Sequence, residues 1–423
     1  MNKENKISLV AAILITINIM LGSGIFINPA PLSKIAGPFG FLGYLVSMII
    51  LIPIVLSIAE LAKLHPASGG LYVYSEKYIN PFIGFVSGWG YFLGKATAAG
   101  LISKIVAVFL KNRIVFLQNF STLFLSFFLI FSLIFLNIIG VKIGGKIQYL
   151  ITTAKAVPIA TVIFTGITYF SLSHYQKINF TELIPQLIPI SIFALMSFEI
   201  ICSIGHLIEN PKRNIKRSIL YSFLIVVLIT IIFQISIYAK LGINLANSKE
   251  PIYLFLLKIF QNHPIISKII NSFVIGSLFG GAFGSLIANS WNIFTLAKNK
   301  HLPFDKTLTK INKKNVAWVS LLFEGIIVCI LLAISKKQIA LQSMAVFCIV
   351  GSYMFSSISA LIANINQSLN KKIIPTLAII SSIYIMWLSL KNLYFYGISF
   401  SFLSIFLIGI IIAFFRNQKI KIQ

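Results

Sequence analysis

Long apolar runs, each closed by a few polar or charged residues, repeat along the whole chain. Each run has about 20 residues or more, the length that an α-helix needs to cross the hydrocarbon core of a bilayer. The runs cover residues 8–36, 38–62, 81–110, 121–140, 147–170, 185–208, 217–239, 268–297, 316–335, 338–365, 373–390 and 394–415. The pattern predicts an all-α polytopic membrane protein with twelve transmembrane helices. The first run is too long for the apolar part of a signal peptide and is expected to remain as a helix.

The composition leads to the same class of protein. Hydrophobic residues make up 58% of the 423 residues and charged residues only 10%, whereas an average soluble domain carries about 25% charged residues. Lipid tails solvate such an apolar exterior directly. A soluble enzyme, a disordered chain and a disulfide scaffold are excluded. Cys202, Cys329 and Cys348 lie inside apolar runs and are expected to be core residues rather than metal ligands or disulfide partners.

The net charge of +26 changes the picture only in one respect, the orientation in the membrane. A soluble protein this basic would suggest a nucleic-acid partner, but here the Lys and Arg residues stand in short gaps between runs. Alternate gaps carry 21 of them on the side of both termini and 11 on the other side, and three lie inside runs. The positive-inside rule then places both termini in the cytoplasm. No nucleic-acid partner is expected, and residues 1–423 form a single integral membrane domain.

The first run contains Gly22-Ser23-Gly24 at its middle. Two glycines around a serine weaken a helix and allow a ligand to approach the backbone closely. If the helix breaks here, the amides that begin its second half carry a partial positive charge and could receive a substrate carboxylate. The alternative is a face of small residues on which another helix packs. The spacing alone does not decide between the two.

The sixth run holds Glu199 at its middle, flanked by Ser197, Ser203 and Gly205. A carboxylate at bilayer depth costs several kcal/mol unless it is paired, protonated or solvated, so it is a candidate for function. A structural carboxylate that is hydrogen-bonded to a neighbouring helix is the alternative. The functional hypothesis lets Glu199 change its protonation as the site opens and closes, which would couple transport to pH.

Runs one and six occupy corresponding places if the first ten helices form two repeats of five. Runs three and eight are both unusually long and are also counterparts in this arrangement. Paired interrupted segments of this kind indicate a transporter site at the interface of inverted repeats. We therefore predict repeats at approximately 8–170 and 185–365, followed by accessory helices at approximately 373–415.

Three further charged residues lie inside runs. Lys155 stands well inside run five, where it must pair, bind backbone carbonyls or lose its proton, and a functional role is favoured over structural pairing. Lys95 in run three and Glu324 in run nine could pair or line an aqueous path. The sequence leaves both roles open.

Four segments of the chain resemble motifs of the amino acid–polyamine–organocation (APC) transporter superfamily. Residues 18–26, Asn-Ile-Met-Leu-Gly-Ser-Gly-Ile-Phe, are similar to its first-helix signature. Residues 65–74, 209–215 and 296–303 are similar to its loops after the second, sixth and eighth helices; they read His-Pro-Ala-Ser-Gly-Gly-Leu-Tyr-Val-Tyr, Glu-Asn-Pro-Lys-Arg-Asn-Ile and Leu-Ala-Lys-Asn-Lys-His-Leu-Pro. The segments follow the family's order, and the resemblance covers nearly the whole chain.

The resemblance implies a secondary active transporter of the bacterial amino acid permease or antiporter type in the cytoplasmic (inner) membrane. Its LeuT-like fold is a five-plus-five inverted repeat with helices one and six unwound around an amino-acid site. Gly22, Ser23 and Gly24 would receive the substrate carboxylate. Carbonyls near Met20 and around Phe193–Met196 would receive the ammonium. Transport by alternating access would be coupled to protons or to a counter-substrate.

The resemblance also assigns roles to single residues. Phe193 stands where related exchangers carry an occluding aromatic, and Tyr91 stands at an inner gate. Glu199 matches the acidic position of the sixth helix, and Lys155 resembles a lysine that replaces a sodium ion in some members. Residues 195–199, Leu-Met-Ser-Phe-Glu, depart from the family's aromatic-x-Gly-x-Glu pattern, and Ser285 replaces an aromatic of some arginine exchangers, so guanidinium stacking is not supported.

Other functions fit the sequence less well. A polyamine or basic amino acid antiporter is the nearest alternative, but it should carry more acidic residues inside the runs. An intramembrane enzyme needs a convergent catalytic set, yet His206 is the single histidine inside a run and no Asp lies in any run. A membrane sensor would normally keep a soluble output domain. We expect no enzymatic activity, cofactor or metal, and a homodimer is compatible with the family.

Overall fold

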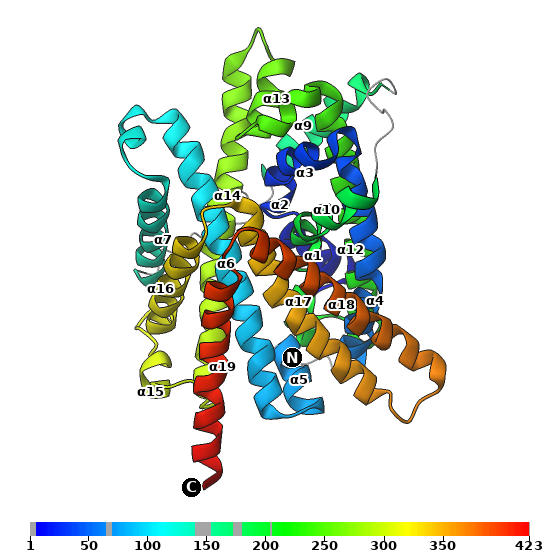
Figure 1. Cartoon of the computed structure of the whole chain (residues 1–423), viewed down its shortest axis with the longest axis vertical. Coiled ribbons are helices and arrows are strands. Elements are labelled where there is room, and N and C mark those ends of the chain that lie inside the picture. The colour runs from blue at the N-terminus through cyan, green and yellow to red at the C-terminus, as the bar shows by residue number, and fades with distance from the viewer. Residues whose placement is uncertain (1–5, 65–69, 140–153, 172–179, 204, 423) are drawn as a thin grey trace. The chain divides into compact units, whose positions relative to one another are not determined.

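The computed structural model describes residues 6–64, 70–139, 154–171, 180–203 and 205–422 and folds them into helices joined by short loops (Figure 1). Within these residues, eight helices are long and apolar enough to cross a membrane: Leu9–Ile27, Pro29–Leu64, Pro81–Arg113, Leu183–Ser203, Pro211–Asn247, Pro264–Lys298, Gln338–Ala363 and Leu369–Phe395. Four shorter apolar helices accompany them, at Thr122–Ile138, Ala156–Tyr169, Trp318–Ile334 and Ser399–Phe415. One of these helices corresponds to each of the twelve predicted runs, and the all-α membrane fold is confirmed.

The first membrane helix is interrupted. Its first part, α1 (Leu9–Met20), begins at Ser8, whose hydroxyl accepts a hydrogen bond from the Ala11 amide. The chain then leaves the helix for three residues and resumes as α2 (Gly24–Ile27) and α3 (Pro29–Ala36). Pro29 opens α3 because the first turn of a helix does not need its missing amide hydrogen.

The sixth membrane helix is interrupted as well. The long part, α10 (Phe180–Leu195), ends four residues before α11 (Ile200–Ser203), and a 3₁₀ turn, η6 (Gly205–Leu207), follows. A short parallel bridge ties this region to the start of the chain, because the Ile7 amide donates to the Leu207 carbonyl and the Glu209 amide donates to the Ile7 carbonyl. Both helices that the sequence marked as irregular are therefore broken.

The chain forms two compact units, which we describe separately. Unit 1 contains Met1–Gly84, Ala156–Asn271 and Val350–Leu388; unit 2 contains Phe85–Lys155, Ser272–Ile349 and Ser389–Gln423. Four long helices run through both units: α6 (Pro81–Arg113), α14 (Pro264–Lys298), α17 (Gln338–Ala363) and α18 (Leu369–Phe395). The predicted inverted repeats follow a different division of the sequence and remain a prediction.

Unit 1 is built around a long helix, α12 (Pro211–Leu241). It packs against α1 and against α4 (Leu42–Leu64), and α10 packs on α4 as well. The other elements of this unit are η2 (Gly37–Phe41), α5 (Leu71–Tyr78), α9 (Ala156–Gly166), η4 (Ile167–Tyr169), η7 (Gly242–Asn247) and α13 (Pro251–Ile259). The two interrupted helices thus share one packed body with α4 and α12.

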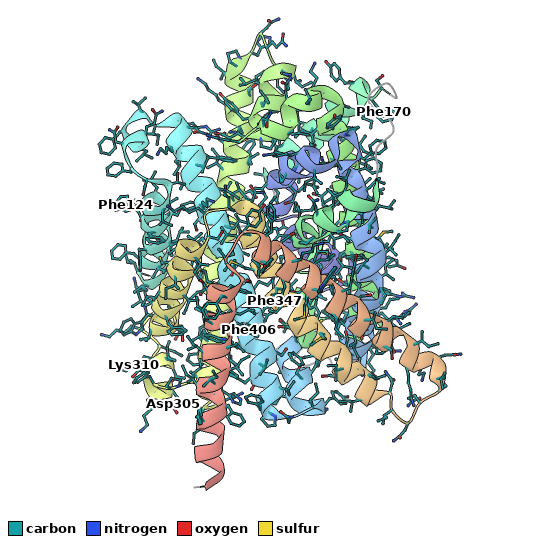
Figure 2. All side chains as sticks on the ribbon, viewed as in Figure 1. Phe124, Phe170, Asp305, Lys310, Phe347 and Phe406 are labelled. Carbon is teal, nitrogen blue, oxygen red and sulfur yellow. The ribbon has the colours of Figure 1, made fainter. Side chains whose placement is uncertain are left out.

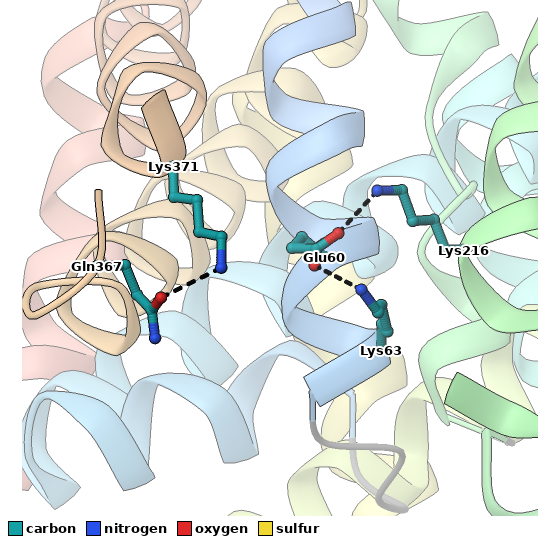
Figure 3. A network of polar contacts seen from close by, with 5 residues as sticks. All are labelled: Glu60, Lys63, Lys216, Gln367 and Lys371. Atoms are coloured by element: carbon teal, nitrogen blue, oxygen red, sulfur yellow. Dashed lines mark hydrogen bonds and ion pairs between the residues drawn. The ribbon is translucent and has the colours of Figure 1, made fainter. Parts of the chain in front are cut away.

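A partly exposed ion pair lies at the C-terminal end of α4. The Glu60 carboxylate accepts hydrogen bonds from Lys63 at 3.0 Å and from Lys216 of α12 at 2.7 Å (Figure 3). The side chains remain about a third or more exposed, so water screens the attraction. The pair links α4 to α12 where both helices lie close to their ends.

Unit 2 consists of continuous helices. Besides its shares of the four long helices it contains η3 (Val115–Asn119), α7 (Thr122–Ile138), α15 (Asp305–Leu308), α16 (Trp318–Ile334) and α19 (Ser399–Ile422). The rings of Phe347 and Phe406 meet at 5.9 Å (Figure 2), and the Trp89 indole donates to the Phe406 carbonyl. These contacts join α6, α17 and α19 through aromatic packing.

One face of α7 carries large apolar side chains that no other element covers. Phe124, Phe128 and Phe135 are all more than half exposed, and Figure 2 shows Phe124 pointing away from the ribbon. In a membrane, lipid tails cover such a face. The exposed phenylalanines therefore agree with a helix at the periphery of a membrane protein.

Candidate functional site

The break in the first helix leaves backbone groups without partners inside the helix. Ser23 caps α2, and its carbonyl accepts from the amides of Phe26 and Ile27. The amides of Gly24 and Ile25 open α2, and the first amides of any helix have no acceptor within it. Met20 and Ser23 are buried beside them. Since these amides point out of the start of a helix, the segment can receive an anion.

The same segment lies directly against the end of α10. A Cβ atom added at Gly24 would lie 2.5 Å from Cβ of Ala194 and 2.6 Å from its Cα. Real Cβ atoms essentially never approach a neighbour that closely, so only glycine allows the two backbones to meet here. This contact explains the second glycine of Gly22-Ser23-Gly24 as a small-residue packing position, and it holds the start of α2 against the last turn of α10.

The break in the sixth helix contains Ser197, whose φ of 80° lies in the left-handed region. A non-glycine residue is disfavoured there by about 1–2 kcal/mol. The family pattern has glycine at this position, and the structure shows that the serine adopts the conformation that glycine favours. The carbonyls at the end of α10, from Phe193 to Leu195, consequently lie next to a chain that has left the helix.

Asn28 connects the two interrupted helices, and the sequence analysis missed it. Its side-chain amide donates to the Ile190 carbonyl of α10 at 2.7 Å, and it is also hydrogen-bonded to the Tyr44 hydroxyl of α4. Asn28 is completely buried, so breaking these bonds would leave polar groups without water. The sequence did offer one signal for such a role, since Asn28 is a polar amide inside an apolar run and stands directly before Pro29.

Glu199 lies at the C-terminal side of the second break and is 2% exposed. The Tyr353 hydroxyl of α17 donates to its Oε2 at 2.5 Å, and the Tyr353 ring packs on Phe198 with centroids 5.1 Å apart. Tyr353 was also missed, because nothing in the sequence of run ten connects it to run six. The carboxylate is thus held by a hydroxyl, a group that can bind either of its protonation states.

A second hydroxyl reaches the segment after Glu199. Tyr74 of α5 donates to the Cys202 sulfur, and Cys202 lies close enough to Glu199 to interact with it electrostatically. Burial, and then the Cys202 thiol, raise the pKa of the Tyr74 hydroxyl far above its usual value. Tyr74 therefore stays protonated. As the last residue of the motif at residues 65–74, it links α5 to the segment that follows the break in the sixth helix.

The other loop motifs form local structure at helix ends. Gly70 begins the described part of the first loop with a φ of 65°, against the Ser203 hydroxyl; residues 65–69 lie outside the described ones. Asn210 has a φ of 44° and caps α12 ahead of Pro211. His301, at the end of the fourth motif, is buried with its ring 5.6 Å from that of Phe85.

The structure places the sequence-predicted residues in both units. Met20, Gly22, Ser23, Gly24, Phe193, Met196 and Glu199 all lie on the two breaks of unit 1. Tyr91 belongs to α6 in unit 2, with the Lys95 ammonium 5.1 Å from its ring centroid. Lys155 also belongs to unit 2; it is buried directly before α9, and residues 140–153 ahead of it lie outside the described residues.

The structure gives the surroundings of Glu324, whose role the sequence left open. Glu324 of α16 does not pair with Lys95, because its Oε1 accepts from the Asn289 amide of α14 at 2.9 Å and its Oε2 has no hydrogen-bond partner. The two residues lie on different helices. The pattern of apolar and polar residues along each helix does not show which side chains of the two helices face each other.

Comparison with known proteins identifies the class of this molecule. The family model described as amino acid permease matches residues 7–423. The chain belongs to the amino acid permease family. It is therefore a membrane transporter and not an enzyme, and both interrupted helices lie within the matched range.

Named relatives of this permease carry amino acids or amines. The serine/threonine exchanger SteT of Bacillus subtilis is 25% identical over 90% of this chain and 90% of its own length. The lysine-specific permease LysP of Lactococcus lactis is 21% identical over 71% of this chain and 64% of its length. The putrescine transporter PotE of Haemophilus influenzae is 24% identical over 67% of this chain and 66% of its length.

Proposed function

We propose that this permease carries a zwitterionic amino acid with an uncharged side chain across the bacterial cytoplasmic membrane by alternating access. The observation that supports the proposal is the pair of interrupted helices, whose adjoining parts α2 and α10 pack together at Gly24 and Ala194. Two broken helices in a membrane protein offer backbone amides on one side and backbone carbonyls on the other. That pair of groups matches the carboxylate and the ammonium of an amino acid.

The substrate carboxylate binds at the start of α2. The amides of Gly24 and Ile25, with the Ser23 hydroxyl beside them, donate to its oxygens. Gly22 carries no side chain that would block this approach, whereas the space beside Gly24 is taken by Ala194 of α10. The positive end of the short helix also favours a negative charge here.

The substrate ammonium binds at the end of α10. Carbonyls between Phe193 and Met196 accept its hydrogens, since the final carbonyls of a helix have no donor within it. The Met20 carbonyl, which accepts from the Gly22 amide at 2.7 Å, offers its second lone pair. The Phe193 ring is buried at this edge and closes over the bound substrate. Tyr91 forms the inner gate by analogy with the family.

The distribution of acidic residues favours an uncharged substrate side chain. Within the interrupted segments 18–28 and 190–203, Glu199 is the one acidic residue, and it already accepts the Tyr353 hydroxyl. A lysine or a polyamine brings a second ammonium that would need its own carboxylate. The similarity to a serine/threonine exchanger supports the same choice, and the similarity to a putrescine transporter keeps a basic substrate as the alternative.

Glu199 and Lys155 couple transport to protons or to a counter-substrate. We assign to Glu199 the binding and release of a proton during the transport cycle, since a carboxylate at that depth is costly unless it is paired, protonated or solvated. Lys155 supplies a fixed cation in place of a sodium ion. Both termini lie in the cytoplasm, the two repeats are 8–170 and 185–365, and a homodimer is compatible with this arrangement.

Uptake into proteoliposomes tests the proposal. We expect serine, threonine, alanine or another neutral amino acid to be taken up, and lysine and putrescine to be taken up at least tenfold more slowly. Loading the vesicles with unlabelled substrate distinguishes an exchanger, which is accelerated, from a proton-coupled permease, which responds to a pH gradient instead. Fast uptake of putrescine alone would contradict the proposal.

The Glu199→Gln variant tests the coupling. Glutamine keeps the shape of the protonated acid and cannot lose a proton, so uptake should lose most of its dependence on pH while the protein still inserts. Glu60→Gln is the matched control, because Glu60 is partly exposed and paired with lysines. A pH profile of Glu199→Gln equal to that of the unmodified protein would leave Glu199 a structural residue.

A further inference from the structure

Unit 2 contains a buried carboxylate to which the proposed function assigns no role. Glu324 is completely buried at the middle of α16. Its Oε1 accepts a hydrogen bond from the Asn289 side-chain amide, and its Oε2 is a buried oxygen without any hydrogen-bond partner. A charged carboxylate that is buried with one neutral donor costs several kcal/mol. Something must therefore neutralise it.

The surrounding side chains cannot supply a metal or sodium site. The Asn289 nitrogen is directed at Glu324 and at the Phe92 carbonyl, 2.9 and 3.2 Å away, and the Asn289 oxygen accepts from Asn292. The only oxygen left open in this group is Oε2 of Glu324, whereas hard cations require about six oxygen ligands. A single open carboxylate oxygen therefore suits a ligand that binds to one acceptor atom only.

Charged groups of the neighbouring helices are occupied elsewhere or lie at helix ends. On α6, Lys95 lies over Tyr91, and Lys104, Lys111 and Arg113 donate to the carbonyls of Lys336, Phe120 and Phe109. On α14 and α15, Lys298 and Lys306 are exposed, and Asp305 is partly exposed. Helix α7 and residues 399–415 of α19 contain no charged residue, and Cys329 is the other titratable group of α16. None of these forms an ion pair with Glu324.

We propose that Glu324 is a proton-binding site that holds its proton permanently, so that α16 carries a neutral carboxylic acid bonded to Asn289. The proton removes the charge that the apolar unit cannot solvate. The Asn289 amide then joins α6, α14 and α16 through two hydrogen bonds, and the ring of Phe92 stacks on Phe323 beside them, with centroids 6.3 Å apart. This inference does not depend on the identity of the substrate.

Infrared spectroscopy of the purified protein tests this directly. A protonated carboxylic acid has a carbonyl stretch above the amide I band, and a carboxylate does not. Because Glu199 also binds a proton under the proposed function, the measurement is made in the Glu199→Gln background, where we expect such a band from pH 5 to pH 8 and its loss when Glu324→Gln is added. Glu60→Gln is the matched control and should leave the band unchanged, because its carboxylate is paired with Lys63 and Lys216.

A thermal-stability measurement gives a second readout. Glutamine is isosteric with the neutral acid, so Glu324→Gln should unfold within a few degrees of the unmodified protein at pH 5 and keep uptake within about twofold. As the pH rises, the unmodified protein should lose stability relative to the variant, because unfolding then releases the proton. A band that is absent before the substitution, or unchanged after it, would show that Glu324 does not hold a proton and would overturn the proposal. A stability difference between the two proteins that does not change with pH would overturn it as well.

Discussion

Glu199 and Glu324 are two buried carboxylates of one membrane protein in opposite settings. Glu199 lies where a helix stops and restarts, under the Tyr353 hydroxyl, next to backbone groups that have left the helix. Glu324 lies inside the continuous helix α16, held by an amide and surrounded by apolar packing. A carboxylate at a break can exchange its partners as the chain moves, whereas one in a continuous helix keeps them. We therefore expect Glu199 to act in transport and Glu324 to stabilise the structure.

The largest effect should come from closing the break itself. Gly24→Ala would place a methyl group 2.5 Å from Ala194, so α2 and α10 must separate or the substrate site must fill. We expect uptake to be abolished while the protein still inserts. Gly281→Ala is the matched control in α14, because a Cβ there meets no atom within 4 Å. Normal uptake by Gly24→Ala would show that the breaks do not form the site.

Removing the partner of each carboxylate should give opposite results. Tyr353→Phe removes the hydroxyl from Glu199, and a hydrogen bond to a charged group is worth about 2 kcal/mol, so uptake should fall by roughly thirtyfold with little change in melting temperature. Asn289→Leu removes the donor of Glu324 and should lower the melting temperature by several degrees while uptake by the folded protein stays within about twofold. Parallel assays of uptake and unfolding on both variants check this. Similar profiles for the two would remove the distinction.

The strained serine at the second break allows a stabilising substitution. Ser197→Gly relieves a left-handed φ of 80° and should raise the free energy of unfolding by about 1 kcal/mol. The same exchange in a regular helix, Ser404→Gly of α19, should lower it by about 0.5 kcal/mol, since glycine disfavours helix. Thermal unfolding of both variants in the same detergent measures the difference. Equal destabilisation would mean that Ser197 is not strained.

Substitution of the partly exposed Glu60 should have the smallest effect on stability. Glu60 accepts from Lys63 and Lys216, but all three side chains are about a third or more exposed, and such pairs contribute about 0.5 kcal/mol. Glu60→Gln should therefore change unfolding by no more than about one degree, and high salt should erase even that difference. A large loss of stability would show that this pair fastens α4 to α12 far more strongly than exposed pairs do.

The sequence predicted the elements of the fold and missed their contacts. Hydrophobic runs follow directly from the thickness of the bilayer, so all twelve helices and both breaks could be predicted. The glycines around Ser23 and the carboxylate at Glu199 were visible because each conflicts locally with a membrane helix. Tyr353 and Asn28 conflict with nothing in their own helices. Their roles arise from distant partners, Glu199 and the Ile190 carbonyl, that only packing brings together.

Departures from a family motif could be interpreted only from the geometry of the folded chain. The serine at position 197 departs from the family pattern, which has glycine there, but its backbone keeps the glycine-like conformation. Lys95 and Glu324 showed the reverse, since opposite charges in two runs suggested a pair that the helices do not form. Side-chain type alone therefore could not decide either case, because backbone geometry and helix rotation determine both.

The bridge between Ile7 and the segment after η6 bears on how this protein should be handled. Two backbone hydrogen bonds tie residue 7 to Leu207 and Glu209, immediately beyond the second break. A purification tag or fluorescent fusion joined close to residue 7 would pull on the segment that follows the broken helix. Reporter proteins and immobilisation handles attached there would alter the kinetics they are meant to record, and a handle beyond α19 avoids this load.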